Sequence, residues 1–270
     1  MRNKGFDALL SYDNKFSNDL SINLTGNFSL YRNEVTYLPQ DVLVSYPGNG
    51  TDKTILNRPV NSFFGYVADG LFQNADEVNS SAAQPGKGIG RIRYKDLNGD
   101  NVINDKDRDF IGNGSPKFTY GLNAAFTYKN FDLSFFVQAI NIKVTNEFKT
   151  YTDFSSLWTG TNWGARTLDA WTPANPGSTI PALTLIDNNN EGRPSTYFIE
   201  DGSYIKLRNL QLGYNLKSLF KSKIQNARIF IQGSNLFTIK SKSFTGTDPE
   251  TPNYGFPVPV IGTIGLNITL

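Results

Sequence analysis

The feature that most constrains this chain is a regular alternation of apolar and polar residues in several separate segments. From Leu20 to Tyr31, apolar residues and glycine occupy the even positions, whereas Ser, Asn, Thr and Tyr occupy the odd positions. Successive side chains of a β-strand point to opposite faces, so this pattern predicts a strand with one apolar and one polar face. We expect seven such strands, less regular in the fifth and sixth, at residues 6–12, 20–31, 118–128, 131–139, 204–214, 228–237 and 260–270.

The connections between these predicted strands alternate strictly between short and long. The short ones lie at residues 13–19, 129–130 and 215–226, and the long ones at 32–117, 141–202 and 238–259. In an antiparallel sheet, all short connections then fall at one end and all long ones at the other. This arrangement is typical of bacterial outer-membrane barrels, in which short turns are periplasmic and long loops extracellular. The expected fold class is all-β, an antiparallel transmembrane β-barrel segment with long extracellular loops.

Aromatic residues occur near both ends of the predicted strands. Outer-membrane barrels carry aromatic girdles at both membrane interfaces. The alternative is a soluble antiparallel sheet whose apolar face packs on a core, but the Ser, Thr, Asn and Gln of the polar face favour a water-filled lumen. The residues near the short connections are Tyr12, Tyr128 and Phe131, and those near the long ones are Phe28, Tyr31, Phe118 and Tyr120.

The composition excludes most catalytic chemistry. The 270 residues include no Cys and no His, which excludes disulfides, zinc-thiolate sites, Ser-His-acid triads and imidazole ligands. The net charge is +2 and the basic residues are scattered, so we expect no nucleic-acid partner. Pairs of loop acids occur at Asp248 and Glu250 and at Asp105 and Asp109, but no pattern predicts the placement that glycoside hydrolysis needs. We therefore expect no enzymatic activity.

A calcium-binding loop is predicted within the first long connection, between Asp96 and Asp107. Calcium takes 6–8 oxygen ligands, and this spacing folds the donors around one point. Position 6 of the loop, where Gly is usual, is Asn101, which tolerates positive φ better than most residues. The alternative is an Asn/Asp-rich turn held by side-chain-to-backbone bonds without a metal. The expected ligands are Asp96, Asn98, Asp100, the Val102 carbonyl, Asn104 and Asp107.

Aromatic residues also gather in the second long connection. On an extracellular loop, such rings would stack on a sugar or contact a partner protein. The alternative is that they pack together and hold the loop in shape. Residues 168–171 are expected to form a short helix that ends before Pro173. The candidate contact residues for a substrate or a covering protein are Tyr151, Phe154, Trp158, Trp163 and Trp171.

Five longer segments carry recognisable motifs. They are GYVADGLFQNADEV (65–78), GRIRYKDLNGDNVINDKDRDFIGNGSPKFTYGLN (90–123), LDAWTPANPGSTIP (168–181), FIEDGSYIKLRNLQLGYNL (198–216) and ARIFIQGSNLFTIKSKSFTGTDPE (227–250). In this order they resemble the SusC/RagA family of TonB-linked outer-membrane transporters of Bacteroidetes. The resemblance extends over nearly the whole chain.

The resemblance implies a 22-stranded barrel that is filled by an N-terminal plug, covered by a SusD-like surface lipoprotein and driven by the TonB complex. Seven strands cannot close such a barrel, and no signal peptide is recognisable, so residues 1–270 are expected to be its C-terminal part. The plug and the TonB box would then lie in a missing N-terminal region. The implied location is the outer membrane of a Gram-negative cell, in contact with lipid.

Two functions follow as hypotheses. In the first, the chain is part of a TonB-dependent importer of oligosaccharides or peptides that acts with a SusD-like lipoprotein. In the second, it is a secreted, soluble, all-β carbohydrate-binding module with a calcium loop. Stable refolding of a monomer in plain buffer would favour the second and exclude the first.

Overall fold

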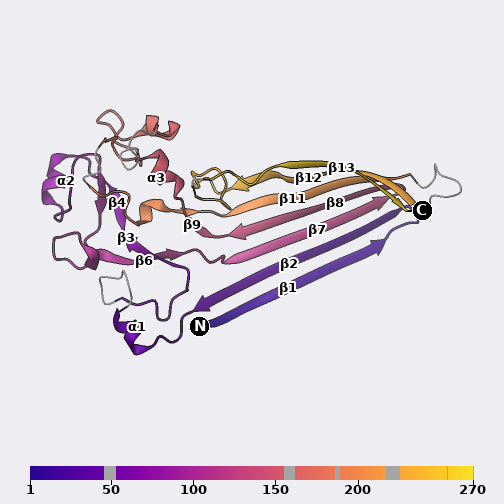
Figure 1. Ribbon diagram of the computed structural model, residues 1–270, viewed down its shortest axis with the longest axis horizontal. Helices are drawn as coiled ribbons and strands as arrows, with labels where there is room; N and C mark the ends of the chain where they lie inside the picture. The colour runs from indigo at the N-terminus through magenta and orange to yellow at the C-terminus, as the bar shows by residue number, and fades with distance from the viewer. Residues whose placement is uncertain (46–52, 155–161, 186–188, 217–225, 254, 270) are drawn as a thin grey trace.

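Seven long strands form one antiparallel sheet in a computed structural model, which describes residues 1–45, 53–154, 162–185, 189–216, 226–253 and 255–269. The strand order is β1-β2-β7-β8-β11-β12-β13, so each long strand pairs with the next long strand along the chain (Figure 1). The seven predicted strands are confirmed. Their bounds are β1 (Arg2–Lys15), β2 (Leu20–Glu34), β7 (Phe118–Tyr128), β8 (Phe131–Asn141), β11 (Tyr204–Asn215), β12 (Asn226–Lys240) and β13 (Ile261–Thr269).

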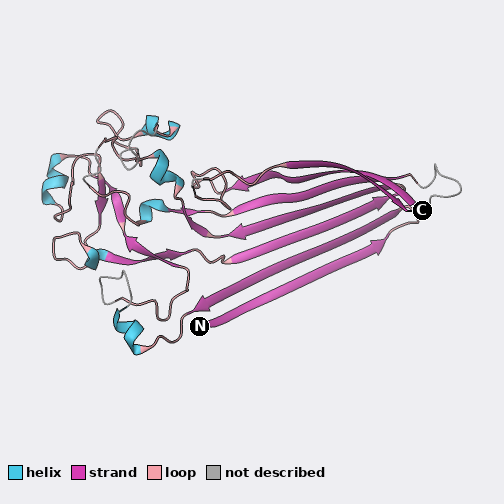
Figure 2. Ribbon diagram, in the orientation of Figure 1, coloured by secondary structure: helices cyan, strands magenta, loops and turns pink. Residues whose placement is uncertain are grey.

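The long connections all leave the sheet at the same end, as predicted. Figure 2 shows the helices and the short strands of the described residues at that end. No helix among the described residues is long and apolar enough to cross a membrane. The architecture is therefore a single-layer sheet with a folded cap of loops at one end.

One face of the sheet is apolar and is covered by no second layer among the described residues. The strand registers align Leu133, Leu212, Ile231 and Ile264 in one row across β8, β11, β12 and β13. These side chains are 37–79% exposed. Burying one such side chain is worth roughly 1.5–3 kcal/mol, so a row of them exposed to water would be strongly unfavourable. A soluble sheet would bury this face, so the soluble alternative gains no support, whereas lipid would cover it.

Two groups of aromatic rings lie near the ends of the strands, as expected. At the loop end, the ring of Phe28 lies 5.1 Å from that of Tyr120 and 6.1 Å from that of Phe118. At the turn end, the ring of Phe131 lies 4.7 Å from that of Tyr214. The placement of Tyr31 in the girdle was wrong, because it lies an odd number of residues from Phe28 and so belongs to the opposite face.

The opposite face is polar and is joined by hydrogen bonds between neighbouring strands. Asn23 of β2 donates to Asp13 of β1 over 3.0 Å, and Gln211 of β11 donates to Gln232 of β12 over 2.9 Å. The alternation breaks at Arg208, which has no partner of its own in the register with β8. This bulge explains the less regular pattern of the fifth predicted strand.

The loops contain short elements that the sequence patterns did not predict. A 3-10 helix spans Ala165–Asp169, so the helix expected at residues 168–171 was misplaced; Trp171 is instead held by a bond from its amide to the Ile180 carbonyl. The described residues also form three two-stranded sheets, β3 (Ser62–Tyr66) with β6 (Arg108–Asn113), β4 (Ala68–Leu71) with β5 (Ile92–Tyr94), and β9 (Lys143–Thr145) with β10 (Ile199–Asp201). The helices in this part of the chain are α1 (Gln40–Ser45), α2 (Ala75–Ser80) and α3 (Phe148–Thr152), with further 3-10 turns at Asp105–Asp107 and Thr196–Phe198.

A hydrophobic core lies within the loops rather than within the sheet. Its side chains come from both the first and the second long loop, so these two loops fold as one unit. The members are Tyr66, Leu71, Ile92, Tyr94, Ile103, Phe154, Trp171 and Phe198.

Candidate functional site

The predicted calcium loop forms a tight turn around Asp96. One oxygen of Asp96 accepts a hydrogen bond from the Gly99 amide and the other accepts one from the Asn101 amide, each at 2.7 Å. Asn101 has a φ of 63°, the left-handed conformation expected at position 6. Hydrogen bonds from the Asn98 side chain and the Val102 amide lower the pKa of Asp100.

The last predicted ligand, Asp107, is fully buried beneath this turn. Its two carboxylate oxygens accept bonds from the Leu97 amide at 2.9 Å and the Asn104 amide at 2.8 Å. No three His, Cys, Asp or Glu side chains among the described residues converge to hold a metal ion. The loop therefore uses the side-chain-to-backbone bonds of the metal-free alternative, and calcium binding stays a prediction.

Two of the five candidate contact aromatics are buried in the loop core. Phe154 is 3% exposed, and its ring packs 5.7 Å from that of Tyr197. Trp171 is 7% exposed, and its indole N–H donates to the Gln73 side chain over 2.9 Å. The expectation that Phe154 and Trp171 contact a substrate or partner is thereby corrected: their rings hold the loops together.

Of the other three aromatic candidates, two are partly exposed and one lies outside the described residues. Tyr151 and Trp163 are half-buried, so part of each ring reaches the surface of the second loop. Trp158 lies outside the described residues. A contact role for these three residues stays a prediction.

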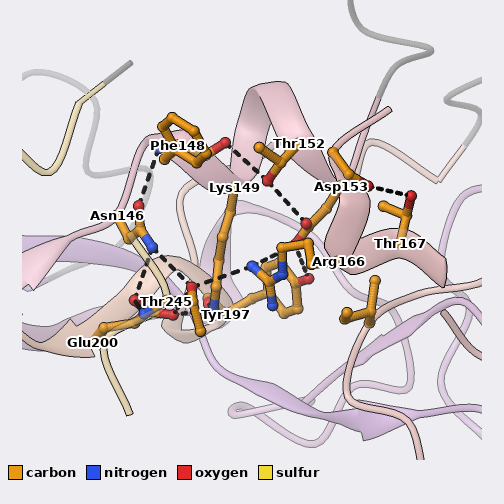
Figure 3. A network of polar contacts seen from close by, with 12 residues as sticks. Asn146, Phe148, Lys149, Thr152, Asp153, Arg166, Thr167, Tyr197, Glu200 and Thr245 are labelled. Atoms are coloured by element: carbon orange, nitrogen blue, oxygen red, sulfur yellow. Dashed lines mark hydrogen bonds and ion pairs between the residues drawn. The ribbon is translucent and has the colours of Figure 1, made fainter. Parts of the chain in front are cut away.

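A buried polar network, which sequence reasoning missed, joins the second long loop to the third (Figure 3). Glu200 accepts hydrogen bonds from Asn146 and Lys149, both at 2.8 Å, and from the amide of Thr245 at 2.9 Å. Burial alone would raise the pKa of Glu200, but Lys149 and the other donors lower it. The carboxylate therefore stays ionised and fixes Thr245 against the second loop.

A second branch of the network is centred on Asp153, next to α3 in Figure 3. Asp153 accepts a 2.5 Å bond from the Tyr197 hydroxyl and pairs with Arg166 at 3.2 Å. Burial raises the pKa of Asp153 despite the nearby Arg166. Arg166 also donates to Thr245 over 3.2 Å, so both branches meet at the third loop.

The first and second loops are tied by a buried carboxylate of their own. Glu191 is fully buried, forms an ion pair with Arg91 and accepts the Ile92 amide at 2.7 Å. The guanidinium of Arg193 lies 4.8 Å from the Tyr66 ring and 4.6 Å from the Tyr94 ring. These contacts link residues about 100 to 130 positions apart, which no local sequence pattern encodes.

Glu250 and Asp109 lack the raised pKa that a glycosidase general acid needs. Burial would raise the pKa of Glu250, but hydrogen bonds from Arg208, Lys206 and Tyr204 lower it to about 2. Burial would likewise raise the pKa of Asp109, but Lys53 lowers it. Both groups are therefore ionised near neutral pH, and each pairs with a basic side chain.

Nearly the whole chain is similar in sequence to TonB-dependent receptors. No protein-family model matches the chain. It is 32% identical to TonB-dependent receptor P3 of Formosa agariphila over 264 residues, which is 94% of this chain and 25% of that receptor. It is 27% identical to the TonB-dependent receptor SusC of Bacteroides thetaiotaomicron over 87% of this chain and 22% of SusC.

The fold is also similar to that of a solved transporter structure. The structure of the RagAB peptide transporter superposes with a TM-score of 0.75 at 22% identity, covering 98% of this chain and 29% of that one. The chain thus spans about a quarter of the length of the curated relatives that it matches. These relatives are receptors and transporters of the outer membrane. The sequence and the fold together show that the chain belongs to the SusC/RagA family of TonB-linked outer-membrane proteins, as a segment of their β-barrel.

Proposed function

We propose that the chain forms part of the wall and of the extracellular surface of a TonB-dependent importer of oligosaccharides or peptides. The observation that carries this proposal is the division of one sheet into an exposed apolar face and a hydrogen-bonded polar face, with every long loop at one end. The first face suits lipid and the second suits a water-filled passage. Both cargo classes stay in the proposal: RagAB is described as a peptide transporter, while the name of the receptor SusC specifies no cargo.

The loops are proposed to contact a SusD-like surface lipoprotein. The buried networks support this, because they join three loops into one firm surface that a lid could close against. Tyr151, Trp158 and Trp163 are the candidate contact residues for substrate or lipoprotein. The TonB complex would act on the whole receptor through a region outside this chain, and the chain itself would have no catalytic role.

Uptake by the full-length receptor tests this function. Cells with and without the receptor gene would be given a starch oligosaccharide mixture and, separately, a tryptic peptide mixture. Receptor-dependent depletion of one mixture, abolished when TonB is inactivated, is the expected result. Receptor-independent depletion of both mixtures, together with failure of the purified receptor to bind either, would exclude the importer.

We also propose a structural calcium ion in the loop from Asp96 to Asp107. The left-handed Asn101 and the double acceptance by Asp96 support it, because they bend the backbone into a tight turn around one carboxylate. A carboxylate oxygen that accepts one hydrogen bond from an amide still has a second lone pair, which can bind a metal ion. The ion would order a long loop.

Calorimetric titration of the full-length receptor with Ca²⁺ tests the metal. The double variant Asp96→Asn and Asp100→Asn should bind one calcium fewer than the wild type, because each change removes a ligand charge. The matched control is Asp69→Asn, an exposed acid in the same long loop. Equal stoichiometry in all three proteins would exclude the site.

A further inference from the structure

Lys206 of β11 is completely buried although it belongs to the polar face of the sheet. Its register partners are Gln138 of β8 and Thr238 of β12, and its neighbours Ile205 and Leu207 point to the apolar face. Only 1% of the Lys206 side chain is exposed. Something on the polar face must therefore cover it and neutralise its charge.

The cover is the start of a segment from the third long loop. Lys206 forms ion pairs with Asp248, at 3.3 Å, and with Glu250. Glu250 also forms an ion pair with Arg208 and accepts a 2.6 Å bond from the Tyr204 hydroxyl. Three side chains of one strand thus hold one carboxylate of the loop.

The bulge in β11 makes this arrangement possible. Arg208 is the extra residue of the bulge, and it turns to the same face as Lys206 instead of alternating away from it. There it donates to Gln138 at 2.7 Å and to Glu250. Two cations therefore meet the two acids of the loop, so the cluster is balanced in charge.

The far end of the same segment is fixed as well. The Val258 amide donates to Asp248 over 3.2 Å, and the Asn235 side chain donates to the Pro259 carbonyl over 3.1 Å. Asn235 lies on β12, opposite the bulge, with a φ of 54°. The segment is therefore attached to β11 at its start and to β12 at its end.

We propose that this segment, residues 248–253 and 255–259, is a fixed inner wall of the transport passage, locked to the barrel by the ionic cluster of Lys206, Arg208, Asp248 and Glu250. The proposal rests on the proposed transport function, which makes the polar face of the sheet the lining of the passage. Segments that move in a transport cycle have few buried contacts and sparse hydrogen bonds. This segment has buried ion pairs at one end and backbone anchors at the other, so the moving parts must lie elsewhere.

A reversible cross-link tests whether the segment moves. Asn235→Cys and Pro259→Cys would be introduced into the full-length receptor and bridged in intact cells with a short bis-methanethiosulfonate reagent; the 270 residues contribute no other cysteine. The expected cross-link yield is the same with or without a protonophore and with either the peptide or the oligosaccharide mixture present. In the presence of either mixture, a cross-link yield in energised cells less than half of that in protonophore-treated cells would overturn the proposal.

Uptake gives the second readout. In cells with the cross-linked receptor, the rate at which the transported mixture is depleted should be within about twofold of the rate in cells whose cross-link has been reduced. A loss of tenfold or more that recovers on reduction would show that the segment must move, and would overturn the proposal. If the wild type takes up neither mixture, the transport function fails, while the cross-link yield still decides whether the segment is fixed.

A variant of the ionic cluster tests whether the cluster itself holds the segment in place. In a receptor that carries Pro252→Cys, the further change Glu250→Gln should raise the rate of maleimide labelling at least fivefold, because it removes the charge that pairs with Arg208 and Lys206. The control Asp69→Asn should leave that rate unchanged. Equal rates in the wild type and Glu250→Gln would mean that the cluster does not lock the segment.

Discussion

Arg228 of β12 reaches across β11 and forms a two-point ion pair with Asp132 of β8, directly above Gly213. The Arg228 Nε donates to the Asp132 Oδ1 at 2.9 Å, and a second nitrogen donates to Oδ2. A Cβ atom on Gly213 would lie 2.5 Å from both side chains. The ion pair therefore joins three strands on the polar face, and it requires a glycine in the middle strand.

The first prediction concerns this glycine. Gly213→Ala should destabilise the barrel by about 1–3 kcal/mol, because the new methyl group must displace the ion pair. Gly262→Ala on β13 is the matched control, since a Cβ there meets nothing within 4 Å. The urea midpoint of the full-length receptor, followed by its heat-dependent gel mobility, is the measurement. Equal midpoints for the two variants would contradict the crossing geometry.

The second prediction tests the two faces of the sheet with adjacent residues. Leu122, near the middle of β7, belongs to the apolar face, and Asn123 to the polar face. Leu122→Arg should cost about 2–4 kcal/mol of barrel stability, because it places a charge in lipid, whereas Asn123→Arg should cost little. Outer-membrane levels of folded receptor measure both. A larger loss for Asn123→Arg would reverse the assignment of the faces.

The third prediction concerns pH. Glu250 has a folded pKa of about 2, against an ordinary value of 4.5. Because the folded value is the lower one, its contribution is complete above about pH 4.5 and is lost as the pH falls toward 2. After correction for the slower reaction of any thiol in acid, labelling of the Pro252→Cys receptor should therefore accelerate over this acid range. Gln at position 250 cannot titrate. With Glu250→Gln added, the same thiol should therefore be labelled at a rate that does not depend on pH, once the pH dependence of the thiol reaction itself has been corrected for.

The fourth prediction concerns the left-handed residue of the calcium loop. Asn101→Val should destabilise the loop by about 1–2 kcal/mol, since a β-branched residue resists positive φ, while Asn101→Gly should be neutral or slightly stabilising. The rate of loop cleavage by an added protease on intact cells reports the difference. Faster cleavage of the Gly variant than of the Val variant would contradict the conformation.

The sheet was predictable from sequence, whereas most of the loop structure was not. A period of two is a local signal, and it located all seven strands and both kinds of connection. The bond from Ala68 to Thr196, by contrast, joins residues 128 positions apart, and Glu200 meets Thr245 across 45 positions. Such pairs depend on how the loops pack, and no spacing encodes them.

The same limit explains why the roles of the loop aromatics could not be decided in advance. A Trp in a polar loop has the same sequence context whether it faces a partner or fills a core. The structure decides the case for Trp171, because a Cβ on Gly90 would lie 2.5 Å from its ring and its N–H is satisfied by Gln73. Its environment is that of a core residue.

The last prediction follows from this environment. Trp171→Ala should destabilise the loop unit by about 3–5 kcal/mol, because it leaves a cavity between the first and second loops. Trp171→Phe keeps most of the ring and loses only the bond to Gln73, so it should cost about 1 kcal/mol beyond the lost ring area. Protease cleavage of the loops on intact cells should accelerate strongly in the first variant and weakly in the second. If Trp171→Ala instead left cleavage unchanged and weakened only the association with a lipoprotein partner, the residue would be a contact residue, and its assignment to the core would be wrong.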